Sequence, residues 1–203
     1  MPINPLAELH TRIQYLACLI NVMVFERNIF LRGTNIYLRA LTHDDVEGNY
    51  RFWFNDKEIT RFNSHGRFPM TPNKLLNFVS SALTTDSFLV LAVVDIKTDR
   101  HIGNISLQGI NWIDRNAEIA FLLGEKEFMS KGVMFDAGTL IIKHGFEVLN
   151  LHRIHCGTSS ENIGMQKLAQ KLGMQREGVR REAIFKEGKY LDVVEYGLVR
   201  IEK

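Results

Sequence analysis

The sequence predicts a single α/β (α+β) domain in which helices flank a mixed, mainly antiparallel twisted sheet. Segments 88–95 and 117–123 are strongly apolar or alternate between apolar and polar residues, which is typical of strands. Segment 133–149 repeats apolar residues at helical spacing. The two kinds of segment interleave along the chain, and the short turn 97–100 joins strand 88–95 to a returning strand, 101–108.

The remaining elements follow from local patterns. Segment 36–41 alternates as a first strand does, and 42–45 then offers a helix start. Segment 63–72 is rich in Gly, Pro, Ser and Asn, so it is predicted to be a loop. The other predicted elements are, in chain order, helix 46–54, a helix from Pro72 to about Leu83, strand 153–158, helix 163–172, and strands 183–185 and 191–200.

Residues 1–28 are predicted to form an N-terminal amphipathic helical extension, and residues 29–203 the domain itself. Asn4 can cap a helix that begins at Pro5, where the missing N–H costs nothing. The stripe either packs on its own domain or forms the contact of a homodimer. Its members recur every three or four positions: Leu6, Leu9, Ile13, Leu16, Ile20 and Met23.

Composition excludes several classes of protein. The chain has 203 residues, of which 45% are hydrophobic and 24% charged, and a net charge of +2. That charge gives no strong field toward nucleic acid or a membrane surface. The apolar run 15–25 is too short for a membrane span, which needs about 20 residues. Cys18 and Cys156 are too few for a disulfide scaffold, so a cytoplasmic protein is expected.

One connection has the pattern of an anion site. Strand 117–124 leads into loop 125–130, and Lys131-Gly132-Val133 then opens the long helix. At a helix N-terminus, main-chain N–H groups without helical partners converge, and the helix dipole adds positive potential. The loop matches neither common glycine-rich phosphate motif, so an ordinary strand-to-helix connection is the alternative.

Several segments in order and spacing resemble the GCN5-related N-acetyltransferases (GNAT superfamily), closest to the branch with the ribosomal-protein alanine and serine N-acetyltransferases. The resemblance covers residues 29–200. The segments that carry it are Tyr37-Leu38-Arg39; Trp53, Asn55-Asp56 and Glu58-Ile59; Ala117 to Phe128; Leu151-His152-Arg153-Ile154 before Glu161-Asn162; Lys171-Leu172-Gly173-Met174; and Arg176 to Arg180 with Gly188 to Asp192.

The resemblance implies an acyltransferase that moves an acetyl group from acetyl-CoA, its co-substrate, to a primary amine without a metal. The acceptor would be a protein N-terminus or a small amine such as an amino sugar. In the family, the strand at Phe121, Leu122 and Leu123 bonds the pantetheine arm, and Asn162 stands where a residue contacts the cofactor. The implied pyrophosphate loop is Met129, Ser130, Lys131, Gly132, Val133 and Met134.

The chain departs from the family pattern at positions that matter. Met129 and Met134 replace a polar residue and a small residue of the pyrophosphate motif, and Ser130 stands where glycine is common. The tyrosine that many members use as general acid is Ala169 here, and a serine common in this branch is Met165. A non-catalytic acyl-CoA-binding or interaction module is therefore the alternative to an active enzyme.

The candidate catalytic base is Glu118, at a position that resembles the usual base of the family. Inward burial of this carboxylate would increase its affinity for a proton, whereas a solvent-facing strand carboxylate is the alternative. Protonation of the leaving thiolate would fall to water, to Ser159 or Ser160, or to no dedicated group.

The loop residues His65 and Arg67 are candidates for binding a carboxylate or sugar phosphate of the acceptor, with a plain surface loop as the alternative. His152 and His155 lack a third ligand at suitable spacing, so no metal site is predicted.

Overall fold

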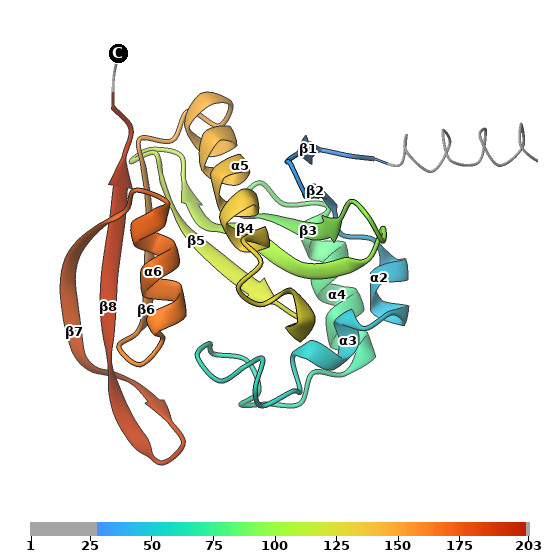
Figure 1. Ribbon diagram of the computed structural model, residues 1–203, viewed down its shortest axis with the longest axis horizontal. Coiled ribbons are helices and arrows are strands. Elements are labelled where there is room, and N and C mark those ends of the chain that lie inside the picture. Colours follow the sequence, from blue (N-terminus) through green and yellow to red (C-terminus); the bar gives the residue numbers. More distant parts are fainter. Residues whose placement is uncertain (1–27, 202–203) are drawn as a thin grey trace, which may run out of the picture.

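The computed structural model describes residues 28–201 and confirms the predicted fold class (Figure 1). One eight-stranded sheet has the order β1-β2-β3-β4-β5-β6-β8-β7, and only β5 and β6 run parallel. The N-terminal helix and its two interpretations lie outside the described residues. The strands are β1 Leu31–Arg32, β2 Ile36–Ala40, β3 Leu89–Asp95, β4 His101–Asn111, β5 Asn116–Leu123, β6 Arg153–Ser159, β7 Gln175–Lys186 and β8 Lys189–Val199.

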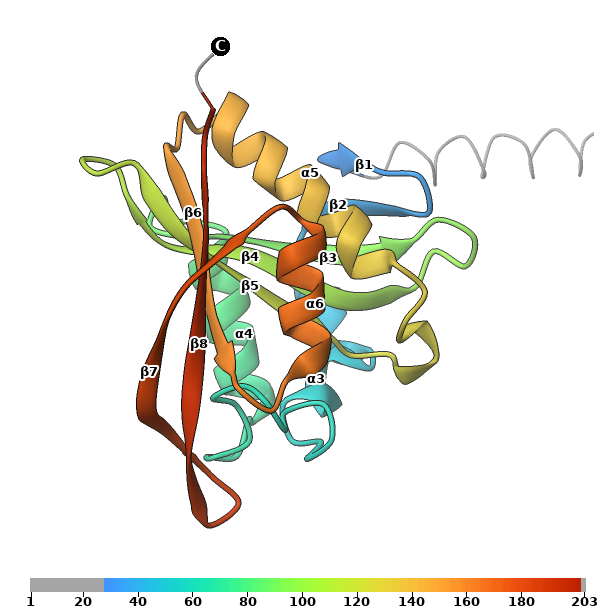
Figure 2. The same cartoon turned by 60° about the vertical axis from the view of Figure 1, so that its left-hand side comes forward.

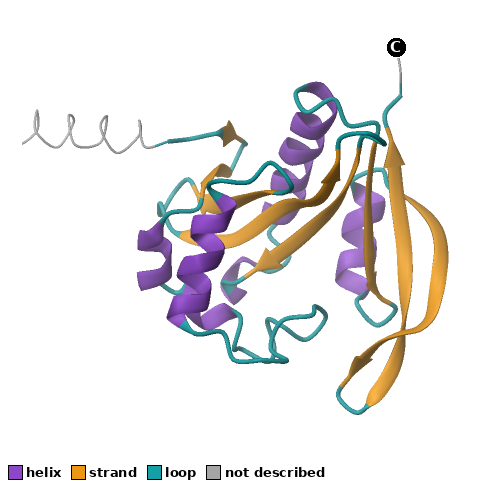
Figure 3. Cartoon of the chain, turned by 180° about the vertical axis from the view of Figure 1, so that it is seen from behind, coloured by secondary structure: helices purple, strands orange, loops and turns teal. Residues whose placement is uncertain are grey.

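Helices cover both faces of the sheet (Figure 2). Helices α5 (Val133–Glu147) and α6 (Ile163–Lys171) lie on one face, and α4 (Pro72–Ala82) lies on the other (Figure 3). Successive strand residues therefore enter two different cores: Ile36 packs on the α5 side and Tyr37 on the α4 side. This explains why the central strands are almost continuously apolar.

The prediction of one continuous helix over residues 46–54 is wrong, because the structure has two short helices in this region. These are α2 (His43–Glu47) and α3 (Tyr50–Trp53). Gly48 ends α2 in an extended conformation, with φ −85° and ψ −158°, which breaks the helical path. At the other end of α2, the Thr42 N–H donates to the Asp45 carboxylate over 2.8 Å, which fixes the helix start.

The C-terminal hairpin is longer than the predicted strands 183–185 and 191–200. Its edge strand, β7, begins at Gln175, and most of its residues are exposed. An exposed edge strand needs no alternation of apolar and polar residues, so the first half of β7 lacks the alternation by which a strand is predicted. The β7–β8 register shifts between Arg180 and Ile184, where Glu182 has a φ of 50°.

Strands β5 and β6 pair at their beginnings only. The paired residues are Asn116 with Arg153, Ala117 with Ile154, and Glu118 with His155. Beyond that point β5 continues to Leu123 and β6 to Ser159, and the two strands diverge (Figure 1). Their facing edges form no ladder with each other in residues 28–201, so main-chain groups there are open to another partner.

A buried ionic cluster ties α2 to the sheet. The Arg39 guanidinium donates to both Asp45 carboxylate oxygens over 2.6 and 2.8 Å, and His101 Nδ1 lies 3.1 Å from the same carboxylate. Burial alone would raise the pKa of Asp45, but the hydrogen bonds from Arg39 and His101 hold it well below its ordinary value. The cluster therefore contributes stability as long as all three partners remain.

Replacing Asp45 by Asn should destabilise the protein by about 3 kcal/mol, because the partly buried Arg39 guanidinium is left without a carboxylate. The measurement is the free energy of unfolding from chemical denaturation at pH 7. Asp86→Asn, at an exposed loop position, is the control and should change stability by less than about 0.5 kcal/mol. Equal stability of the two variants would contradict a structural role for the cluster.

Candidate active site

The start of α5 is built as an anion cradle. Gly132 caps the helix in the left-handed conformation, with φ 79° and ψ 0°, and Ser130 is also left-handed, with φ 59°. The first helical hydrogen bond runs from the Asp136 N–H to the Gly132 carbonyl over 3.0 Å, and no side chain caps the helix. The N–H groups of residues 132–135 therefore remain available to a bound anion, and the helix dipole favours negative charge there.

An open cavity of about 650 Å³ lies in front of this cradle; we call it the α5–α6 cavity. It is formed by the loop before α5, by the side of α6 that carries Gly164, Met165, Leu168 and Lys171, and by segment 58–63. The structure brings together here seven of the residues that the sequence proposed for the co-substrate: Leu123, Met129, Ser130, Gly132, Val133, Met134 and Asn162. Lys131 does not line the cavity; its ammonium lies 5.1 Å from the centre of the Phe128 ring.

Two cationic side chains that the sequence analysis did not single out also line the α5–α6 cavity. Lys171 lies at the end of α6, with its ammonium 4.3 Å from the centre of the Phe135 ring. Arg61 comes from the segment after α3 and lies over the Phe62 ring. Lys171 begins the Lys-Leu-Gly-Met segment that carries the resemblance, which was its only signal in the sequence.

The unusual Met134 is accommodated by a glycine on the sheet. A Cβ at Gly103 would collide with the Leu122 carbonyl oxygen and lie 2.5 Å from the Met134 methyl group, so the close approach of β5 requires glycine here, and the Met134 methyl occupies the space beside it. Met134 is half-buried and packs on the core beneath α5. The departure from the family pattern therefore leaves the left-handed loop in place.

Asn162 begins α6 beside the cradle. Its side-chain oxygen accepts a hydrogen bond from the Met165 N–H over 3.1 Å and caps the helix. Ala169, at the position of the family tyrosine, is fully buried in the core, and Met165 lines the α5–α6 cavity. Neither side chain can donate a proton to a leaving thiolate.

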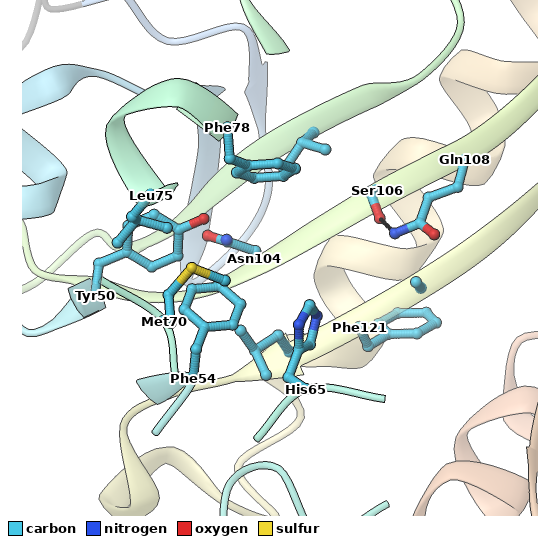
Figure 4. Close-up of a pocket in the computed structure, with 13 residues that line it drawn as sticks. Tyr50, Phe54, His65, Met70, Leu75, Phe78, Asn104, Ser106, Gln108 and Phe121 are labelled. Carbon is cyan, nitrogen blue, oxygen red and sulfur yellow. Dashed lines mark hydrogen bonds between the residues drawn. The ribbon is translucent and has the colours of Figure 1, made fainter. Parts of the chain in front are cut away.

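A second cavity, of about 150 Å³, lies on the other side of β5; we call it the β4–β5 cavity (Figure 4). Phe121 and Leu122 line it, whereas their neighbour Leu123 lines the α5–α6 cavity. The end of β5 therefore separates two hollows that approach it from opposite sides. The remaining lining residues are mostly apolar or aromatic, namely Tyr50, Phe54, Met70, Leu75, Phe78, Val90 and Ala120. The polar ones are His65, Asn104, Ser106 and Gln108.

His65 and Arg67, the predicted acceptor-binding residues, face different hollows. The His65 ring lies edge-on to Phe54, with 4.8 Å between ring centres, and lines the β4–β5 cavity (Figure 4). Desolvation by its surroundings, and then the nearby Lys186 ammonium, lower the pKa of His65 below its ordinary value. The Arg67 guanidinium instead donates to the Phe185 carbonyl over 3.3 Å, at the tip of the β7–β8 hairpin.

Glu118 is exposed, so of the two alternatives for its carboxylate the solvent-facing one is observed. It is the last β5 residue that pairs with β6 and lines neither cavity. Its negative charge lies close enough to the buried thiol of Cys156 to raise the pKa of that thiol. Burial, followed by the charges of Glu118 and Glu195, raises the pKa of Cys156 to about 12, so this thiol is not a nucleophile.

Within residues 28–201, no helix has the length and hydrophobicity needed to cross a membrane. The same part of the chain contains no group of three or more His, Cys, Asp or Glu side chains arranged to hold a metal ion.

Comparison with known proteins places this geometry in a family. The family model of the acetyltransferase (GNAT) domain matches residues 35–175, which include β5, the cradle and the whole of α6. The chain belongs to the GNAT acetyltransferase family. Its members use acetyl-CoA, and the relatives described next are named N-acetyltransferases; the chain is an N-acetyltransferase of the EC 2.3.1 class. The resemblance read from the sequence is thereby confirmed.

Individual relatives agree with this assignment. The Bacillus subtilis (strain 168) protein named "Probable N-acetyltransferase YjcK" is 28% identical over 169 residues, which is 80% of this chain and 92% of the relative. The spermidine N(1)-acetyltransferase of Escherichia coli (strain K12) is 30% identical over 92 residues, 45% of this chain and 49% of that one. A Vibrio cholerae spermidine N-acetyltransferase solved with CoA and spermine shares the fold, with a TM-score of 0.74, 24% identity, and coverage of 81% of this chain and 95% of that one.

Gly132→Ala should weaken acetyl-CoA binding about tenfold, because the left-handed conformation costs a residue with a Cβ roughly 1–2 kcal/mol. No atom lies within 4 Å of the added methyl group, so the effect is conformational rather than a clash. Gly164→Ala is the matched control, since Gly164 lines the same cavity and its Cβ would meet only the Asn162 side-chain oxygen at 3.7 Å. Calorimetry measures both affinities, and equal losses would contradict the cradle.

Proposed function

We propose that this enzyme acetylates a primary amine by direct attack of the amine nitrogen on the thioester of acetyl-CoA. The acceptor is either a protein N-terminus or a small amine such as an amino sugar. The carbon–nitrogen bond of an amide forms, the carbon–sulfur bond breaks, and CoA leaves as the thiol after the amine proton has been passed on. The chain's own part is to hold both substrates and to move that proton.

The observation that carries the proposal is the divergence of β5 from β6 directly before the α5 cradle. The unpaired edge of β5 around Phe121, Leu122 and Leu123 offers main-chain groups to the amide-containing arm of acetyl-CoA. Within the loop from Met129 to Met134, the N–H groups of Gly132, Val133 and Met134 are offered to its pyrophosphate, whereas those of Met129 and Lys131 already donate to the Lys126 and Phe128 carbonyls. Asn162 and Lys171 complete the same hollow.

The β4–β5 cavity supports an approach of the amine from the opposite side of β5. Phe121 and Leu122 line this cavity, and Leu123 lines the α5–α6 cavity, so one short strand segment borders both hollows. A thioester held at that segment is within reach of a nitrogen arriving through the β4–β5 cavity. Orientation of this kind supplies a large share of the rate in acyl transfer.

Glu118 is our candidate for proton acceptance, and water carries the proton to it. By strand alternation Glu118 shares a face with Ala120 and Leu122, both of which line the β4–β5 cavity. An exposed carboxylate at the edge of that hollow can act through one water molecule. His65 is our candidate for contacting the amine, because its uncharged ring does not repel an ammonium group.

Glu118→Gln should lower kcat about 100-fold, the usual loss when a general base is removed, and leave acetyl-CoA affinity nearly unchanged. Steady-state thiol release gives kcat, and calorimetry gives the affinity. Glu147→Gln, at an exposed position near the end of α5, should retain wild-type kcat. Unchanged turnover of Glu118→Gln removes Glu118 from the base role.

In the wild-type enzyme, KM for the amine should rise only at a pH below the ordinary histidine pKa of about 6.5, because the lowered pKa of His65 postpones the positive charge that repels an ammonium acceptor. At pH 7 and above the ring is neutral, since its pKa is lowered. His65→Gln should flatten this acid limb and raise KM several-fold at pH 7, with kcat retained. A large fall of kcat instead would assign proton acceptance to His65.

A further inference from the structure

A third hollow, of about 490 Å³, lies between segment 57–67 and the tip of the β7–β8 hairpin. We call it the basic cavity, because four cationic side chains line it and Glu187 is its only carboxylate within the described residues. The cations are Lys57, Arg61, Arg67 and Lys186. They come from two parts of the chain more than a hundred residues apart.

The cations of the basic cavity keep their charge unneutralised. The Lys186 ammonium donates to the main-chain carbonyls of Thr60 (2.9 Å) and His65 (3.5 Å), and Arg67 donates to that of Phe185. In residues 28–201, none of the four forms an ion pair with a carboxylate. Nearby cations differ in this: Lys126 pairs with Glu58, Lys189 with Glu161 and Arg180 with Glu195.

The basic cavity adjoins the place where the acceptor enters. Segment 57–67 is a wall shared by three hollows, with His65 facing the β4–β5 cavity and its neighbours Gly66 and Arg67 facing the basic cavity. The loop from His65 to Arg67 therefore borders both hollows, and the four cations lie on the far side of His65 from the β4–β5 cavity.

The lining of the β4–β5 cavity holds no counter-charge for a second positive charge, and the exposed Glu118 at its edge is already assigned to proton acceptance. Among its described lining residues there is no Asp, Glu, Lys or Arg. The buried Tyr50 hydroxyl, the Asn104 amide and the hydrogen-bonded pair of Gln108 and Ser106 are neutral (Figure 4). A polyamine would place its additional ammonium groups either among uncharged side chains or against four cations, and both placements are unfavourable.

We propose that the acceptor is a primary amine that also carries a carboxylate or phosphate group, which binds in the basic cavity. This rests on the proposed function and narrows its acceptor class. The Arg67 guanidinium can meet either anion with two parallel hydrogen bonds, and the Lys186 ammonium adds a point charge. Polyamines, the acceptors named for two of the relatives above, are poor substrates on this proposal.

The first test compares kcat/KM, from thiol release, within sets of acceptors that share the reacting amine and carry a negative, neutral or positive group beyond it. Glucosamine 6-phosphate against glucosamine tests an anion on a small molecule. The peptide Ser-Glu-Glu-Ala amide, against the Ser-Lys-Lys-Ala and Ser-Ala-Ala-Ala amides, tests an anion on a polypeptide. We expect the anionic member of at least one set to be preferred about tenfold, with the preference falling at high salt, and spermidine to be the poorest acceptor.

The second test removes the charges singly. Arg67→Gln and Lys186→Gln should each raise KM for the anionic acceptor about tenfold, with the neutral acceptor and the acetyl-CoA affinity unchanged. Lys97→Gln removes one exposed cation outside the cavities and should change nothing. Because Lys186 also ties the hairpin to segment 57–67, Arg67→Gln is the deciding variant if Lys186→Gln loosens the fold.

The outcomes separate the two proposals. Equal or better turnover of spermidine, or a loss of acetyl-CoA affinity in Arg67→Gln in place of a KM effect, overturns the anionic acceptor while acetyl transfer stands. If no amine of the panel releases thiol from acetyl-CoA, the proposed function itself fails.

Discussion

The parting of β5 from β6 after Glu118 and His155 is the constraint on which the rest of the site depends. An interior pair of parallel strands would normally continue its ladder, because unpaired main-chain groups are costly away from water. Here each strand leaves its neighbour and then leads into a helix, β5 into α5 and β6 into α6. One departure from regular pairing thus produces an open strand edge and two helix N-termini around the same hollow.

Packing around the end of β5 explains why the strands part. Glu125, just beyond the strand, is buried; it accepts a hydrogen bond from the Trp53 indole over 3.1 Å and pairs with Arg100. Gly124 lets the Trp53 ring lie against the main chain, where any Cβ would collide with it. The end of β5 is thereby held toward α3, whereas β6 follows its antiparallel partner β8 along its whole length.

The sequence predicted the features that depend on local pattern and missed those that depend on distant neighbours. Helix α5 and the cradle at Gly132 follow from a strand, a loop with glycine and an amphipathic repeat, all contiguous. Whether Glu118 is buried depends on what covers its face, and strand alternation alone cannot decide that. The basic cavity joins Arg67 to Lys186, which no local pattern relates.

Two separate sets of cations are expected if the enzyme binds two anionic ligands at the same time. The α5 N-terminus and Lys171 serve the α5–α6 cavity, and Arg67 and Lys186 serve the basic cavity. Like charges brought within about 10 Å of each other repel noticeably at ordinary salt, so each anion needs its own counter-charge. Arg61 lines both hollows and lies between the two sets. A net charge of only +2 hides this arrangement, because the field that matters is local to segment 57–67 and its neighbours.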